Sequence, residues 1–206
     1  MRADLYARHL KRACDVAASA AGLIVLSPLM LAVAAAMKLV DPGPVLFSQT
    51  RAGLASKPFK IFKFRTMRAG GGGPQITCGD DARVTPLGRL LRRTKIDELP
   101  QLFNVLRGDM SVVGPRPEVP KYVELFKSDY AVILSVKPGI TDYAAIKYRD
   151  EEAVLRAYRD PEVGYVTKVL PDKIALYRRY IENVGFATDM KIILATVAKV
   201  AGGDVR

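Results

Sequence analysis

Apolar residues run almost without interruption from Val16 to Val40, and only Ser19, Ser27, Pro28 and Lys38 break the pattern. A run of 25 residues is long enough to cross a bilayer. It is too long for the apolar part of a cleaved signal peptide, and no convincing small-residue cleavage site follows it. The pattern therefore predicts a membrane-inserted helix near the N-terminus.

Basic residues lie on both sides of this run, which bears on how it enters a membrane. Four precede it: Arg2, Arg8, Lys11 and Arg12. The chain after it is also strongly basic, and positive charge favours the cytoplasmic side at both ends. Because Pro28 removes a helical hydrogen bond, the helix can kink and return to the side it entered from. We expect a re-entrant membrane helix hairpin over Ala13–Lys38, with a kinked spanning helix or a buried core helix as alternatives.

After Asp41 the pattern changes to short strands and amphipathic helices. Two short runs, Val45–Gln49 and Phe59–Phe64, predict an antiparallel hairpin. Helical patterns cover Arg83–Arg93, Lys121–Val136, Glu151–Tyr158, Pro171–Glu182 and Thr188–Ala201. The last two are basic and amphipathic, which suits either a membrane surface or packing onto the protein's own core. The predicted fold class is α+β and mostly helical.

The stretch from Thr94 to Gly108 carries the candidate chemistry. Apolar residues recur at helical spacing and predict a buried stripe: Ile96, Leu99, Leu102, Phe103 and Leu106. Polar residues and a glycine share another face: Asp97, Gln101, Asn104 and Gly108. With Thr94 as N-cap and Gly108 as the stop, Asp97 is expected in the first turn, ionised and aimed outward.

A carboxylate in that position can act as a nucleophile or as a magnesium ligand. The structural alternative is an acidic pair, Asp97 and Glu98, that caps a helix and is neutralised by nearby cations. Those cations are Arg92, Arg93 and Lys95.

The composition indicates what kind of partner the chain binds and excludes several kinds of site. The net charge of +11 suits a partner rich in phosphate, namely nucleic acid, anionic lipid or nucleotide. Cys14 and Cys78 are too few for a disulfide framework or a zinc site. His9 is the only histidine, which excludes a Ser-His triad and a histidine metal cluster.

Several motifs occur in the order typical of one family. They are Lys60-Ile-Phe-Lys63-Phe-Arg65-Thr66-Met67, Asp97-Glu98-Leu-Pro-Gln101-Leu-Phe-Asn104, Gly108-Asp109-Met-Ser111, Gly114-Pro-Arg116-Pro117, Lys137-Pro-Gly139-Ile-Thr141 and Asp189-Met-Lys191. From about Lys11 to Val200, the chain resembles the monotopic phosphoglycosyl transferases among the bacterial sugar transferases. The resemblance implies a re-entrant membrane helix over residues 1–40 and a cytoplasmic catalytic domain over residues 41–206.

The resemblance also implies a reaction. Family members move a phosphosugar from a UDP-sugar to a polyprenol phosphate such as undecaprenyl phosphate, which gives a polyprenyl diphosphate sugar and UMP. This is the first membrane-committed step of bacterial glycoconjugate synthesis. The implied location is the cytoplasmic face of the bacterial inner membrane, in contact with membrane lipid and possible downstream glycosyltransferases, and without nucleic acid as a partner.

Residue roles follow from matching positions. Asp97 matches the nucleophile that forms the covalent phosphosugar intermediate, and Glu98 would contact Mg2+ with Asp97 or manage the acceptor's proton. Lys63, Arg92 and Arg116 match phosphate-binding positions. Weaker substrate-binding candidates are Gln101, Asn104, Arg149 and Asp189, of which Asp189 could instead cap its helix.

One loop departs from the pattern of many relatives. Where they have glycine, glutamine and glycine, this chain has Asp142, Ala145 and Tyr148, although Arg149 aligns. If the loop contacts the nucleotide or sugar, its donors and shape are changed, so the sugar stays open.

Three other classes explain less of the chain. A basic membrane-bound binding protein would account for the charge, but acids at Asp97 and Glu98 would repel its anionic ligands. A helix-turn-helix over residues 83–108 conflicts with Pro100 and with the membrane segment. A multi-pass polyprenol phosphate transferase needs many apolar spans, whereas this chain has one such run.

Overall fold

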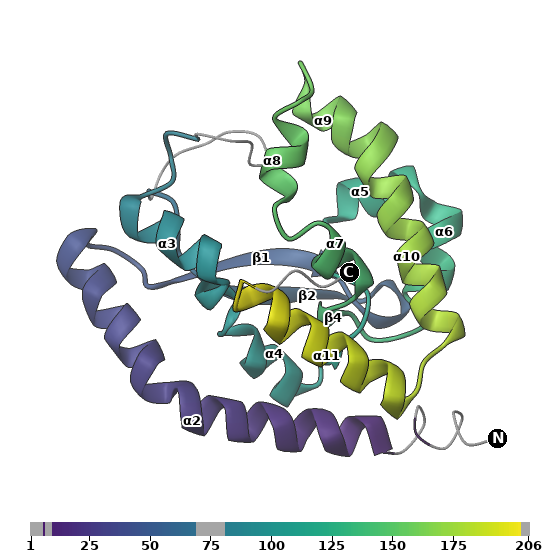
Figure 1. Cartoon of the computed structure of the whole chain (residues 1–206), viewed down its shortest axis with the longest axis horizontal. Coiled ribbons are helices and arrows are strands. Elements are labelled where there is room, and N and C mark those ends of the chain that lie inside the picture. The colour runs from purple at the N-terminus through teal and green to yellow at the C-terminus, as the bar shows by residue number, and fades with distance from the viewer. Residues whose placement is uncertain (1–5, 7–9, 69–80, 203–206) are drawn as a thin grey trace.

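The computed structural model describes residue 6, residues 10–68 and residues 81–202. The helices and strands follow in the order α2 (Lys11–Val40), β1 (Leu46–Ala52), η2 (Leu54–Ser56), β2 (Pro58–Phe64), α3 (Pro86–Thr94), η3 (Ile96–Glu98), α4 (Gln101–Arg107), β3 (Ser111–Val113), α5 (Pro120–Leu125), α6 (Lys127–Ile133), β4 (Gly139–Thr141), α7 (Tyr143–Lys147), α8 (Glu151–Leu155), α9 (Pro161–Gly164), η4 (Tyr165–Val169), α10 (Leu170–Glu182) and α11 (Phe186–Val200). The chain is mostly helical, as predicted, with α2 along one side and the hairpin near the centre (Figure 1).

Helix α2 is continuous but changes direction part-way along its length (Figure 1). Pro28 lies inside it and leaves the carbonyl of Ile24 without its helical donor. The Ser27 hydroxyl donates to that carbonyl at 2.8 Å, so the freed acceptor is satisfied where the proline interrupts the ladder. The expected break at Ser27-Pro28 is thus a bend within one helix, and re-entrant insertion stays a prediction.

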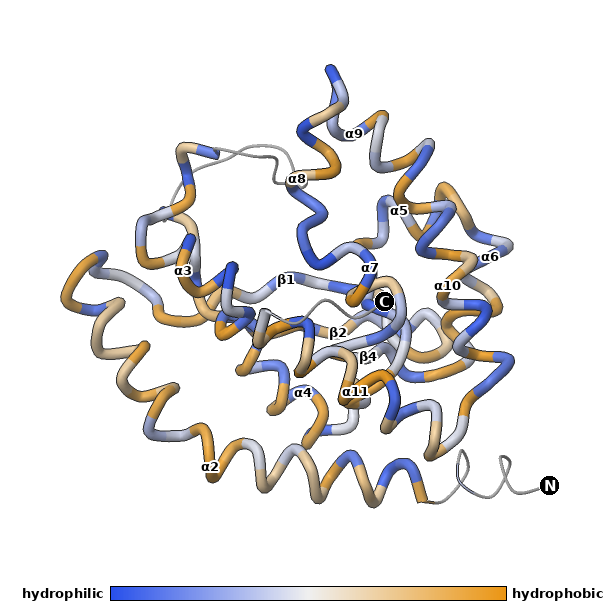
Figure 2. Tube along the Cα trace, viewed as in Figure 1, coloured by the Kyte–Doolittle hydropathy of each residue, from blue (hydrophilic) through white to orange (hydrophobic). Residues whose placement is uncertain are grey.

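Helix α2 is hydrophobic along most of its length (Figure 2). Among the described residues, α2 is the one helix that is long and apolar enough to cross a membrane. Ile24, Val25 and Leu31 are at least 70% exposed. Since water disfavours such a continuous apolar surface, it marks a site of contact with lipid or protein.

Helix α2 contacts the rest of the protein through both of its arms, which are the residues before Pro28 and the residues after it. In the first arm, Asp15 accepts hydrogen bonds from the Ser111 hydroxyl and the Val112 amide, each at 3.0 Å. In the second arm, Val33 and Met37 share a small core with residues of β2 and α3. The domain boundary expected at residue 40 stays a prediction, although α2 has this core in common with the following residues.

The predicted hairpin is confirmed as β1 and β2, which pair antiparallel from Leu46↔Phe64 to Ala52↔Pro58. A second sheet was not predicted. Strands β3 and β4 form a short parallel pair, with Ser111 opposite Gly139. A Cβ on Gly139 would lie 2.1 Å from the Gly114 amide nitrogen, so this close crossing of two backbones requires glycine. The pair was missed because three-residue strands carry too little alternation to detect.

The predicted helix near Arg83–Arg93 begins at Pro86, where the Thr85 hydroxyl accepts a hydrogen bond from the Gly88 amide at 2.9 Å. The single helix expected over Lys121–Val136 is instead two, α5 and α6, because the backbone leaves helical geometry at Phe126. The expected helices near Glu151, Pro171 and Thr188 are confirmed as α8, α10 and α11 with shifted ends. The largest core lies among α5, α6, α8, η4 and α10.

Candidate active site

The two candidate carboxylates sit in a tight connection between α3 and α4. Thr94 is the last residue of α3 rather than the N-cap of the next helix, and its hydroxyl donates back to the carbonyl of Leu90 at 2.8 Å. Lys95 adopts a left-handed conformation (φ 57°), after which η3 carries Asp97 and Glu98. Both side chains are buried, at 7% and 9% exposure, so the expectation that Asp97 points outward into solvent is wrong.

The faces expected for residues 94–108 are largely reversed. Gln101 and Asn104 are fully buried, whereas Phe103 and Leu106 are exposed. The polar residues do share one face, but that face packs against the hairpin, where Asn104 bonds β2, and the apolar residues of α4 are left outside. Gly108 does end the helix, with φ 94°.

Asn104 holds α4 against the hairpin. Its side-chain oxygen accepts from the Phe62 amide at 3.0 Å, and its side-chain nitrogen donates to the Lys60 carbonyl at 2.8 Å. These bonds imitate the pairing of another strand on the edge of β2. Asn104 is therefore a scaffold residue that brings Lys63 on β2 next to the carboxylates on η3.

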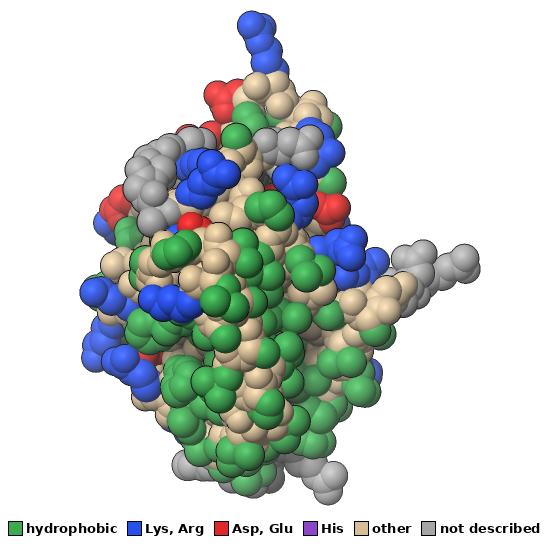
Figure 3. All heavy atoms as spheres, turned by 90° about the vertical axis from the view of Figure 1, so that its left-hand side faces the viewer, with side chains coloured by type: hydrophobic (Ala, Val, Ile, Leu, Met, Phe, Trp, Pro, Cys, Tyr) green, Lys and Arg blue, Asp and Glu red, His purple; other side chains and the backbone are tan. Residues whose placement is uncertain are grey.

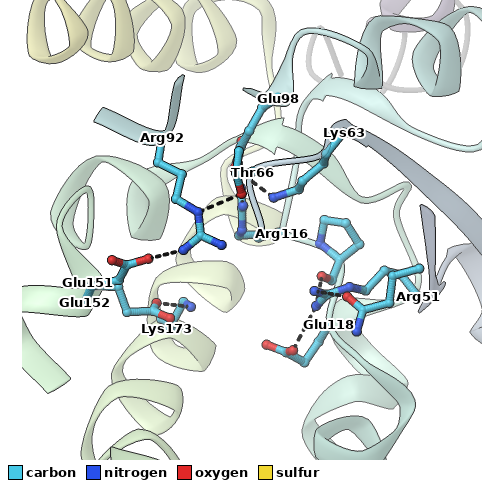
Figure 4. A network of polar contacts seen from close by, with 12 residues as sticks. Arg51, Lys63, Thr66, Arg92, Glu98, Arg116, Glu118, Glu151, Glu152 and Lys173 are labelled. Carbon is cyan, nitrogen blue, oxygen red and sulfur yellow. Dashed lines mark hydrogen bonds and ion pairs between the residues drawn. The ribbon is translucent and has the colours of Figure 1, made fainter. Parts of the chain in front are cut away.

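Glu98 binds two cations from distant parts of the chain (Figure 4). Lys63 Nζ donates to Oε1 at 3.0 Å. Arg116 binds both oxygens, with Nη2 at 2.5 Å from Oε1 and Nη1 at 3.1 Å from Oε2. The bidentate geometry fixes the plane of the guanidinium relative to the carboxylate. Glu98 thus positions the two expected phosphate-binding residues of β2 and the β3–α5 loop.

The environment of this cluster shifts the pKa values of its two acids in opposite directions. Burial alone would raise the pKa of Glu98, but the charges of Arg116 and Lys63 outweigh it and hold that pKa well below its usual range. Burial raises the pKa of Asp97, and the charge of Glu98 adds to the rise. Burial also lowers the pKa of Lys63 to about 8, although Glu98 opposes the change. Glu98 is therefore a poor proton acceptor at neutral pH, and Asp97 is the more basic carboxylate.

Asp97 has a free oxygen. Its Oδ1 is buried and finds no hydrogen-bond partner among the residues that the structure describes, and the same holds for both atoms of the Gln101 amide. Buried polar atoms are usually paired, so such atoms mark a place that a ligand or ion would complete. Asp97 and Gln101 therefore each present a buried polar atom that a bound ligand or ion could pair.

Arg92 approaches the same cluster from α3. Its Nε donates to the Thr66 hydroxyl at 2.9 Å, and its Nη1 donates to Glu152 at 2.6 Å (Figure 4). Thr66 follows β2, two positions after the end of the strand. The structure therefore brings together five predicted site residues besides Asp97: Lys63, Arg92, Glu98, Gln101 and Arg116.

Two other predicted residues lie in different contacts. Arg149 donates to the carbonyl of Lys199 and, at 3.4 Å, to that of Val200, at the end of α11. Asp189 is buried and accepts from the Tyr6 hydroxyl at 2.8 Å, Lys11 Nζ at 2.5 Å and the Tyr180 hydroxyl at 2.9 Å. Asp189 therefore ties the start of α2 to α10 and α11.

The loop after β4, which departs from the pattern of many relatives, makes hydrogen bonds within the fold. Asp142 is buried and caps α7, where its Oδ1 accepts from the Ala145 amide at 2.8 Å. Burial raises the pKa of Asp142. The Tyr148 hydroxyl donates to Asp172 on α10 at 2.8 Å. Asp142 and Tyr148 thus bond other parts of the fold, while Asp142 Oδ2 is buried without a partner among the described residues, and contact with a sugar or nucleotide stays a prediction.

A buried polar layer behind Arg116 was missed by sequence reasoning. Arg51 Nη1 lies 3.2 Å from Glu118 Oε1, and Glu118 Oε2 accepts from the Tyr165 hydroxyl at 2.5 Å. Lys173 Nζ, nearly buried, donates to Glu151 at 2.5 Å. These partners are separated by 22 to 67 residues, so no local pattern in the sequence could have paired them.

Comparison with known proteins places the chain in a family. Residues 6–203 match the bacterial sugar transferase family. The chain is 42% identical to the UDP-glucose:undecaprenyl-phosphate glucose-1-phosphate transferase of Caulobacter vibrioides, covering 91% of the chain and 68% of that protein. It is 41% identical to the exopolysaccharide production protein PSS of Rhizobium leguminosarum bv. phaseoli, covering 91% and 93%.

A third relative handles another sugar. The UDP-N-acetylgalactosamine-undecaprenyl-phosphate N-acetylgalactosaminephosphotransferase of Aeromonas hydrophila is 36% identical over 94% of the chain, which spans 44% of that protein. The named activities share one class of reaction and differ in the sugar. From the match over residues 6–203 and these identities, the chain belongs to the bacterial sugar transferase family and is a transferase.

Proposed function

We propose that the chain transfers a phosphosugar from a UDP-sugar to undecaprenyl phosphate through a covalent intermediate on Asp97. The observation that carries this proposal is the buried, unpartnered Oδ1 of Asp97 beside a carboxylate that holds two cations. Two of the relatives named above, those of Caulobacter vibrioides and Aeromonas hydrophila, are named for a UDP-sugar and undecaprenyl phosphate, which supports the substrate class. Their differing sugars leave the identity of the sugar open.

The reaction has two displacement steps at one phosphorus. Asp97 Oδ1 attacks the phosphorus that bears the sugar, and the bond from that phosphorus to the bridging oxygen breaks, which releases UMP. An oxygen of undecaprenyl phosphate then attacks the same phosphorus, and the bond to Asp97 breaks. The products are undecaprenyl diphosphate sugar and the restored carboxylate. A raised pKa makes Asp97 a stronger nucleophile once it is ionised.

The proposed role of the cations Lys63, Arg92 and Arg116 is to bind the phosphate groups of the substrates. Lys63 and Arg116 keep donor hydrogens beyond those given to Glu98, and Arg92 brings a third positive charge from α3. Preorganised charges stabilise the charge that develops on the transferred phosphoryl group. Because Glu98 stays ionised and doubly held, its proposed role is to orient Lys63 and Arg116 rather than to move the acceptor's proton.

A magnesium ion fits the free atoms of the site. The described residues contain no cluster of three or more His, Cys, Asp or Glu side chains that could hold a metal ion. Mg2+ is commonly bound by one or two carboxylates together with substrate phosphates and water. Asp97 has an oxygen available for it, whereas both oxygens of Glu98 already accept from cations. When bound, the ion would neutralise charge on the diphosphate.

The membrane is the proposed meeting place of the two substrates. Figure 3 shows hydrophobic side chains gathered over one face, with Lys and Arg side chains around them. Exposed apolar residues of α2, α4 and α11 include Leu31, Phe103 and Leu194. We propose that α2 enters one leaflet from the cytoplasmic side of the bacterial inner membrane and returns.

The pKa directions predict a bell-shaped pH profile. Asp97 must be ionised to attack, so kcat/KM should rise with pH on the acid side, with an inflection above the usual aspartate value of about 3.9. Lys63 must be protonated, so kcat/KM should fall as the pH rises through about 8. Lys63→Arg should move this fall to higher pH because a guanidinium does not titrate there. A fall that stays near pH 8 in Lys63→Arg would assign the basic limb to another group.

The direct test of the proposed function is UMP release from a panel of UDP-sugars. The detergent-solubilised chain would be assayed with Mg2+, with and without undecaprenyl phosphate. We expect UMP release that depends on the lipid for multiple turnovers and is selective for one sugar. Binding of UDP-sugars without any release of UMP would instead indicate a binding protein and would contradict the proposal.

A further inference from the structure

Two side chains bind the Arg92 guanidinium. Thr66 accepts from its Nε, and Glu152 of α8 accepts from its Nη1 at 2.6 Å (Figure 4). The Glu152 side chain is 38% exposed and the Arg92 side chain 23%. A half-exposed carboxylate thus binds one side of a guanidinium whose Nε is held by Thr66, just after β2.

The helix that carries Glu152 is anchored by its neighbour. Glu151 accepts from Lys173 Nζ at 2.5 Å, and the Lys173 side chain is 5% exposed. Asp150 caps the same helix through the Ala153 amide at 3.1 Å. Consecutive residues on a helix do not face the same way. Glu151 therefore holds α8 against α10, while Glu152 reaches across to α3.

Glu152 differs from Glu98 in how firmly it is held. Glu98 uses both oxygens, binds two cations and has a side chain only 11% exposed. Among the residues that the structure describes, the Glu152 carboxylate has one polar partner, Arg92, through Oε1, and exposed ion pairs of this kind are weak. An incoming phosphate would therefore replace Glu152 on Arg92 and leave Glu98 in place, because phosphate binds a guanidinium bidentately and carries more charge.

We propose that Glu152 is a competing anion of the donor site: it occupies Arg92 until the diphosphate of a nucleotide donor displaces it. This inference rests on the proposed function, because it assigns the displacing ligand as a nucleoside diphosphate. Displacement of Glu152 from Arg92 opens the contact between α8 and α3. Because the donor must break this ion pair, it binds more weakly than it would to a site without the Glu152 carboxylate. Glu152 is thus a determinant of donor affinity that acts through Arg92.

The binding test uses UDP and inorganic pyrophosphate as probes in the presence of Mg2+, measured by calorimetry on the full detergent-solubilised chain. Glu152→Gln keeps the shape of the side chain and removes its charge. We expect roughly two- to fivefold tighter binding of both probes, the range that an exposed ion pair supports. Glu162→Gln on α9, which breaks another exposed pair, with Lys121, should leave binding unchanged.

A double variant decides whether the effect passes through Arg92. With Arg92→Gln as the background, Glu152→Gln should change probe affinity by no more than the experimental error. Weaker binding in Glu152→Gln alone would mean that Glu152 positions Arg92 for the donor and would overturn the proposal. Equal binding in Glu152→Gln and the unsubstituted chain would overturn it as well, while leaving the transferase function intact.

Hydrogen exchange of the unsubstituted chain gives an independent measurement that needs no variant to fold. Saturating UDP should increase amide exchange within residues 151–155, because the contact with α3 is released, even as amides near Asp97 become more protected. Unchanged or slower exchange in α8 would contradict the proposal. An unsubstituted chain that binds neither UDP nor pyrophosphate would contradict both this inference and the proposed function.

Discussion

Asp97→Asn should abolish UMP release, with a loss of at least about a thousandfold in kcat, because the amide cannot form the bond to phosphorus. The fold should survive the change. Burial and the charge of Glu98 raise the pKa of Asp97, which means that the folded state disfavours its ionised form at neutral pH. An uncharged side chain of the same shape removes that penalty, so the melting temperature should be equal or higher.

Intact-mass measurement provides the decisive observation for Asp97. The unsubstituted chain, incubated with the cognate UDP-sugar without lipid, should gain the mass of one phosphosugar, and Asp97→Asn should gain none. The matched control is Asp129→Asn, which changes an exposed carboxylate paired with Arg178 on α10. It should retain full UMP release. Turnover retained by Asp97→Asn would remove this residue from the nucleophile role.

Glu98→Gln should reduce both activity and stability, because it removes the anion that holds Lys63 and Arg116. Removing one partner of a buried ion pair costs about 3–5 kcal/mol, and Arg116, whose side chain is 29% exposed, brings the expected loss to about 2–4 kcal/mol. For a chain of this size we expect a melting temperature roughly 4–16 °C lower. Activity should fall about a hundredfold or more as both cations lose their orientation.

The pH profile separates loss of orientation from simple unfolding. Glu98 raises the pKa of Lys63 against the effects of burial and Arg116. Without Glu98, the pKa of Lys63 should fall further, so the basic limb of kcat/KM should move below about 8 in Glu98→Gln. Glu124→Gln, which breaks an exposed pair with Lys127, should change neither the profile nor the melting temperature. A destabilised Glu98→Gln protein with an unmoved basic limb would show that Glu98 acts only on stability.

Local sequence patterns located most elements, because each depends on residues close together in the chain. The long apolar run predicted α2, two short runs predicted β1 and β2, and the helical pattern over Arg83–Arg93 predicted α3. The family motifs pointed to the residues of the candidate site. Besides Asp97, these are Lys63, Arg92, Glu98, Gln101 and Arg116.

Burial and partnership came from the tertiary structure alone. A helical pattern from Thr94 to Gly108 groups residues by face but does not say which face packs inward, so the buried and exposed faces of α4 were exchanged in the prediction. Nor could it show that the Asn104 side chain bonds the backbone of β2.

By itself, the sequence determined the long apolar helix, the antiparallel β-hairpin and the family, since these depend on composition and local order, and it is the basis on which Asp97 is proposed as the reacting acid. The tertiary structure decided what each charged group faces: Glu98 holds Lys63 and Arg116, Asp189 holds Lys11, and Glu152 holds Arg92. The physical reason is distance along the chain. Ion pairs between residues 18 to 178 positions apart arise only when the fold brings their elements together, and no local preference encodes them.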